Sequence, residues 1–109
     1  ADLHRIRKEF EMDDEEVRAI IAEDNFQKYF GELKGEELKT APKGFDKTHP
    51  AIDLIRKKQY LLTRYFSDEE VLSPNFKEEV IATFQAMRPF FDYISDVLST
   101  DLNGESLYD

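Results

Sequence analysis

The residues best placed to do chemistry lie in one loop, residues 38–50, which holds two prolines and a glycine. It carries Lys39, Lys43 and Asp46, and His49 directly precedes Pro50. Proline suits the first position of a helix, and the N–H groups at a helix start attract anions. The pattern therefore predicts one candidate ligand-binding site, for an anionic small molecule, lined by Lys39, Lys43, Asp46 and His49.

An alternative explanation of the same loop is purely structural. His49, Thr48 or Asp46 can cap the helix that starts at Pro50, while the lysines are solvated. Proline also lacks an N–H, so this helix start has one donor fewer for an anion. We favour the capping explanation and keep the anion site as the alternative.

Other kinds of site find no support in the residue types. The chain has no cysteine, which excludes disulfides and thiolate metal ligands. Its two histidines, His4 and His49, are far apart in sequence and do not have the spacing of zinc ligands. No glycine-rich phosphate loop or nucleophile motif occurs. We expect no metal and no cofactor, we identify no catalytic residue, and whether the chain is an enzyme stays open.

The charge balance limits the partners. The 109 residues have a formal net charge of −9, which disfavours nucleic acid and anionic membranes as partners. Residues 34–64 are net positive, whereas the flanking segments are both negative. No apolar run approaches the roughly 20 residues of a membrane span, and no signal-peptide pattern opens the chain. We expect a cytoplasmic protein.

Periodicity predicts a mainly helical α+β fold with about five helices. Helices are expected at residues 3–10, from 13 or 14, from 25 to a stop at Gly31, and from Pro50 to about 58, with a capped turn at 67–72. The longest is expected at 74–98, kinked near Pro89. Its apolar positions recur every three or four residues: Phe76, Val80, Phe84, Met87, Phe91, Ile94 and Leu98. We predict one domain, residues 1–98, followed by a polar tail, residues 99–109.

Residues 59–66 are the best strand in the chain, because they are rich in aromatic and apolar side chains. A second, weaker strand is expected at residues 36–40. Two strands alone make a marginally stable ribbon. We therefore expect residues 59–66 to pair with strands that this chain lacks, or with a second copy of itself, although a small sheet closed within the chain remains an alternative.

A motif in the middle of the chain resembles an uncharacterised bacterial and fungal family, the domain of unknown function numbered 2461. The matching residues are Leu38, Lys39, Pro42, Lys43, Gly44, Phe45, His49, Pro50, Asp53, Leu54, Arg56 and Lys58. The segment SDEEVLSPNF and a final helix with Arg88-Pro89 also fit, whereas Gln59 replaces the family's usual apolar residue. The resemblance implies the C-terminal half of an α+β protein about twice as long, and it implies no reaction.

Two hypotheses for function remain. The first is a non-catalytic structural or interaction half, which the N-terminal half of its own parent protein, or self-association through residues 59–66, would complete. The second is part of an enzyme, or of an anionic small-ligand site, that the missing half completes. We favour the first because residues 59–66 have too few strand partners within the chain.

Overall fold

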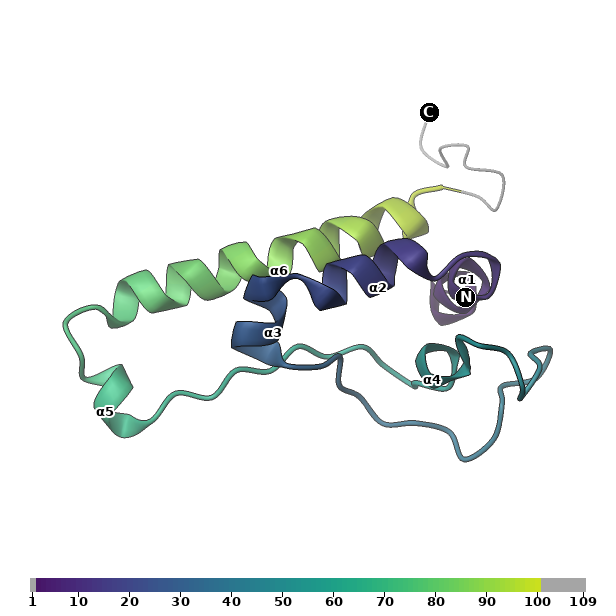
Figure 1. The fold of residues 1–109 in the computed structure, drawn as a ribbon, viewed down its shortest axis with the longest axis horizontal. Helices are drawn as coiled ribbons and strands as arrows, with labels where there is room; N and C mark the ends of the chain where they lie inside the picture. Colours follow the sequence, from purple (N-terminus) through teal and green to yellow (C-terminus); the bar gives the residue numbers. More distant parts are fainter. Residues whose placement is uncertain (1, 101–109) are drawn as a thin grey trace.

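The structure, a computed structural model, describes residues 2–100 and is mainly helical. Within these residues six helices follow one another along the chain (Figure 1): α1 (Asp2–Met12), α2 (Glu15–Ala22), α3 (Asp24–Phe30), α4 (Ile52–Ile55), α5 (Asp68–Val71) and α6 (Phe76–Leu98). The first three helices pack against α6, and α1 also packs against α4. Long extended segments connect α3 to α4 and α4 to α5 (Figure 1).

Two local signals end and begin helices as the sequence predicts. Gly31 follows α3 with φ of 72°, a conformation that glycine adopts without strain, and its N–H bonds to the carbonyls of the last turn. Ser67 and Glu70 form a capping box at α5, in which each side chain accepts from the other residue's N–H. Local chemistry therefore sets these boundaries.

Other predicted boundaries were too generous. The helix after Pro50 ends at Ile55 instead of near residue 58, and the last helix begins at Phe76 instead of 74. α6 continues through Pro89 as one helix. Of the predicted polar tail, residues 101–109 lie outside the described residues.

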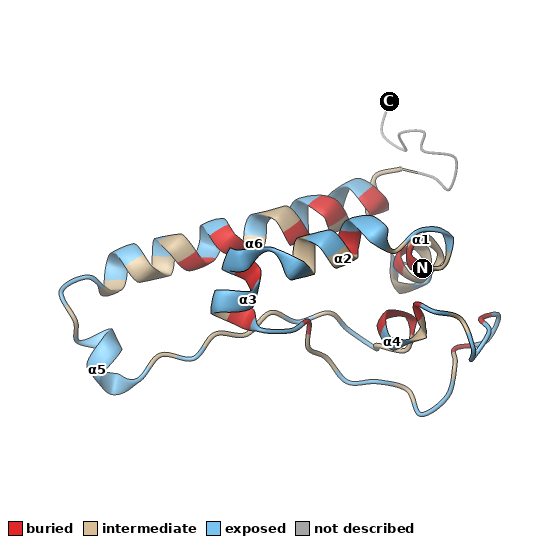
Figure 2. Ribbon diagram, in the orientation of Figure 1, coloured by how far each residue is buried: buried red, intermediate tan, exposed pale blue. Residues whose placement is uncertain are grey.

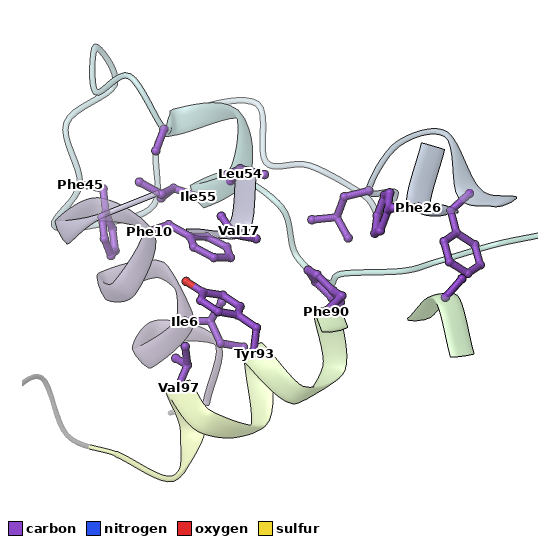
Figure 3. Packing of buried hydrophobic residues seen from close by; sticks show 14 residues of the cluster. Ile6, Phe10, Val17, Phe26, Phe45, Leu54, Ile55, Phe90, Tyr93 and Val97 are labelled. Carbon is purple, nitrogen blue, oxygen red and sulfur yellow. The ribbon is translucent and has the colours of Figure 1, made fainter. Parts of the chain in front are cut away.

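One aromatic-rich core holds the helices together (Figure 3). Phe10 of α1 is fully buried; its ring stacks on Tyr93 of α6 at 6.4 Å and meets Tyr60 edge-on at 5.6 Å. Phe26 of α3 contacts Phe90 of α6 with the two rings tilted and their centroids 6.4 Å apart. The core therefore follows one face of α6 and is covered by α1, α2, α3 and α4.

The core covers only part of the predicted apolar stripe of α6, because Met87, Ile94 and Leu98 are partly buried against it. The buried residues of this helix are Thr83, Ala86, Phe90, Tyr93 and Val97. In the stripe expected from periodicity, Phe84 is 60% exposed and Phe91 46% exposed (Figure 2). α6 is apolar on two neighbouring faces, and periodicity alone cannot tell which of them a short chain will bury.

Neither predicted strand, residues 59–66 nor residues 36–40, forms a β-strand in the described part of the chain. The backbone in this region pairs through two isolated antiparallel bridges, Lys34 with Leu61 and Glu37 with Lys57, and each bridge has one member outside the predicted ranges. Two residues separate the bridges on one side and three on the other, so the register slips and no continuous ladder forms. The α+β prediction is therefore wrong in its β part for residues 2–100.

Gly35 lies at the point where the register slips. Its φ is 140°, and a Cβ built there would lie 2.0 Å from the carbonyl oxygen of Gln59. Only a residue without a side chain allows the two backbones to approach this closely. The close approach holds the α3–α4 connection against residues 57–61.

Candidate interaction surface

Residues 60–66 are extended and have very little backbone pairing (Figure 1). Leu61 exchanges both backbone hydrogen bonds with Lys34, at 2.8 and 2.9 Å. From Leu62 to Phe66 no backbone N–H or C=O bonds to any other residue in the range 2–100. We call residues 62–66 the open edge. It is the local structure that a β-strand would have before its neighbour is added.

Arg64 anchors this segment to α6. Its guanidinium donates to the Glu79 carboxylate at 2.8 Å, to the Glu79 carbonyl at 3.3 Å, and to the hydroxyl of Thr83. The rings of Tyr29 and Phe66 lie 4.2 and 4.4 Å from it. The side chain is only 15% exposed. A charged group that is this buried needs such partners, and here they fix one side of the extended segment to the helix.

Aromatic contacts fix the two ends of the segment. The Tyr60 hydroxyl donates to the Leu54 carbonyl at 3.0 Å, and burial raises the pKa of this phenol to about 12. Phe66 meets Phe76 edge-on at 5.1 Å. The Oγ1 of Thr63, between them, is buried with no hydrogen-bond partner among the described residues. The segment is thus held at both ends and in the middle, while most of its backbone stays unpaired.

Large apolar side chains are exposed beside the open edge and along α6. Tyr65 is 85% exposed and Leu72, just after α5, is 84% exposed. On α6, Ile81, Phe84 and Phe91 are between 46% and 60% exposed, and we call these three residues the α6 stripe. Monomeric proteins seldom leave so many large apolar side chains in water without a binding role.

The predicted loop site has a different geometry. The Nδ1 atom of His49 accepts from the Ala51 N–H at 3.0 Å, which means that its Nε2 carries the proton and donates to the Glu11 carbonyl at 3.1 Å. This neutral imidazole links the end of α1 to the start of α4. Both ring nitrogens are therefore already used within the protein. The bond to Ala51 is not a side-chain cap, because Ala51 is itself the N-cap of α4 and no side chain caps this helix.

The other predicted site residues lie on the loop surface. Asp46 accepts from the N–H and the hydroxyl of Thr48 at 2.8 and 2.7 Å, and these bonds lower the pKa of its carboxyl group. Lys39 and Lys43 are exposed, and neither side chain has a hydrogen bond or ion pair with another residue that the structure describes. α4 has only four residues, too few for a strong helix dipole. The anion site stays a prediction.

An open groove of about 460 Å³ lies between α2, α4 and the α3–α4 connection. Arg18 of α2 spans it with two bonds to Asp53 of α4, at 2.8 and 2.9 Å, and these bonds lower the pKa of the aspartate. Lys57 pairs with Glu37 at 3.7 Å on the same wall. No local pattern indicates the Arg18–Asp53 pair, because its members lie 35 residues apart and only the fold brings α2 and α4 together.

Two kinds of feature are missing from the described residues, 2–100. No group of three or more potential ligand side chains is arranged to hold a metal ion. No helix in this range is long and apolar enough to cross a membrane.

Comparisons with known proteins bear on the family alone. No curated protein and no solved structure matches the chain. One family model, described as a conserved hypothetical protein (DUF2461), matches residues 1–93, and this range includes α1 to α5, the open edge and most of α6. The chain belongs to the DUF2461 family of conserved hypothetical proteins.

Proposed function

We propose that this chain is a non-catalytic interaction half, which completes a larger α+β fold by binding another polypeptide along the open edge and over the α6 stripe. The observation that carries the proposal is the row of unpaired backbone groups from Leu62 to Phe66. Unpaired strand edges are templates for an added strand. The resemblance leads us to expect that the N-terminal half of the family's longer chains covers the α6 stripe.

The way in which the open edge is anchored supports a binding role for this segment and argues against an ordinary surface loop. A surface loop whose backbone only meets water does not need a buried arginine to hold it. Arg64 nevertheless makes three hydrogen bonds and two ring contacts that keep the segment extended. A strand that is already ordered loses less conformational entropy when its partner arrives, which favours binding.

Residue-resolved amide hydrogen exchange on the whole chain tests this proposal. In the monomer we expect the amides of Leu62, Arg64 and Phe66 to exchange rapidly, because no other residue in the range 2–100 bonds to them. The Leu61 amide, bonded to Lys34, is the matched reference and should be slower. Slow exchange at all three positions in a chain that light scattering shows to be monomeric would overturn the proposal.

A further inference from the structure

The residues on either side of the open edge have opposite charges that mirror one another about Thr63. Arg56, Lys57 and Lys58 precede the extended segment, and Asp68, Glu69 and Glu70 follow it. Each basic position has an acidic counterpart at the same distance from residue 63. Asp68, Glu69 and Glu70 form the first turn of α5 at one end of the extended segment, and the basic residues lie between α4 and its other end. An antiparallel pair of identical segments centred on Thr63 would therefore bring the basic end of each copy close to the acidic end of the other.

The directions in which the backbone N–H and C=O groups of this segment point also agree with a twofold axis at residue 63. Leu61 turns both its N–H and its C=O toward Lys34. In an extended chain successive residues turn these groups to opposite sides, so those of Leu62, Arg64 and Phe66 face away from Lys34. A twofold axis at residue 63 sets Leu62 opposite Arg64 of the second copy, which joins residues whose hydrogen-bonding groups face each other. If the pairing were shifted by one residue, Leu62 would lie opposite a residue whose hydrogen-bonding groups face the other way.

The side chains are also complementary under this symmetry. Tyr60 would lie opposite Phe66 of the second copy, and the exposed Leu61 opposite the exposed Tyr65. Aromatic and apolar cross-strand pairs of this kind stabilise antiparallel sheets. In Figure 1 the segment passes the α3–α4 connection near α3 and then runs alone to α5.

The charged side chains at the two ends of the segment differ in whether they already have a partner within the same chain. Arg56 binds the Leu38 carbonyl, and Lys57 pairs with Glu37. Lys58 is half-exposed, and its nearest carboxylate, on Glu36, is 4.0 Å away. The exposed carboxylate of Asp68 has no cationic partner among the described residues. Lys58 and Asp68 are therefore the pair that can form between copies.

We infer that the strand that fills the open edge is a second copy of this chain, paired antiparallel about Thr63 in a twofold dimer with Lys58 opposite Asp68 of the other copy. This inference rests on the proposed function, because it names the polypeptide that pairs with the open edge. A twofold interface needs a self-complementary surface, and the mirrored charges supply one.

Sedimentation of the whole chain from micromolar to millimolar concentration tests the dimer. We expect concentration-dependent dimers, with Lys58→Glu and Asp68→Lys each weakening dimerisation by about fivefold, because every dimer contains two such exposed pairs. An equimolar mixture of the two variants should regain the original affinity, since each variant then meets an opposite charge. Dimers that ignore both substitutions, or variants that fail to complement each other, would overturn the inference.

A proline pair tests the edge directly. Leu62→Pro removes an N–H that faces the second copy, whereas Tyr65→Pro removes one that faces the other way. Neither amide bonds to another residue of the described range, 2–100, so neither variant removes a hydrogen bond from this part of the monomer. We expect only Leu62→Pro to abolish dimers, and equal effects would overturn the inference. A chain that stays monomeric throughout, with fast exchange at Leu62, Arg64 and Phe66, refutes the second copy and leaves the proposed function standing.

Discussion

Phe90 and Phe91 are adjacent in α6, identical in type, and different in burial. Phe90 is 1% exposed and packs against Phe26, whereas Phe91 belongs to the α6 stripe and is 46% exposed. Phe90→Ala should lower the free energy of unfolding by about 3–5 kcal/mol, the usual cost of deleting a buried phenyl ring. Phe91→Ala should cost about 1 kcal/mol or less, because half of the ring already contacts water and alanine favours helix.

Urea unfolding followed by circular dichroism measures both changes. The expected gap of roughly 3 kcal/mol corresponds to a midpoint difference of about 2 M urea for a domain of this size. If Phe90→Ala does not fold, Phe90→Leu keeps the comparison possible, with an expected cost of about 1 kcal/mol against almost none for Phe91→Leu. Equal costs at the two positions would refute the assignment of one buried and one exposed face.

Three further predictions follow from single contacts, each read by denaturant unfolding. Gly35→Ala should destabilise far more than Gly31→Ala: both have positive φ, but only Gly35 has a carbonyl oxygen 2.0 Å from a new Cβ, and similar costs would contradict that approach. Asp53→Asn should destabilise modestly at pH 7; since Arg18 lowers the folded-state pKa of Asp53, the difference from wild type should fade as pH falls below about 4, and a difference that persists would argue against the ion pair. His49→Ala should cost about 1–3 kcal/mol because it removes two hydrogen bonds, with no loss indicating that the imidazole is not structural.

Features that depend on neighbouring residues were predictable from the sequence. The capping box at Ser67 and Glu70 and the glycine stop after α3 need only residues within one turn of the helix. The existence of α6 was also predictable, because its apolar residues recur at helical spacing along its 23 residues. Which of its faces would be buried was not predictable, since that depends on where α1, α2 and α3 pack.

The strand at residues 59–66 failed for a related reason. Its aromatic and apolar residues favour extended backbone, and the backbone is indeed extended between α4 and α5. A β-strand also needs a partner in register, and here the only neighbouring segment slips by one residue between its two bridges. Sequence pattern predicts the conformation of a segment better than it predicts whether the chain supplies a partner.

The open edge is held in place mainly by contacts between residues that are far apart in the sequence. No local sequence pattern indicates these contacts. Arg64 reaches Glu79 and Thr83 across α5 and a turn, and Tyr29 comes from a helix much earlier in the chain. An arginine within an aromatic stretch predicts equally well an exposed side chain on a sheet. Only the packing of α3 and α6 around the segment makes it an anchor.

The order of the open edge and its lack of backbone partners are best understood together. Five residues held extended lose conformational entropy, of order 1 kcal/mol or more per residue, and gain no backbone hydrogen bond in return. Arg64 and the contacts of Tyr60 and Phe66 offset that loss from the side-chain direction. Because those contacts are made by side chains, they leave the backbone groups of Leu62 to Phe66 available. A segment stabilised in this way is prepared for a second strand, and the mirrored charges around Thr63 favour one from an identical chain.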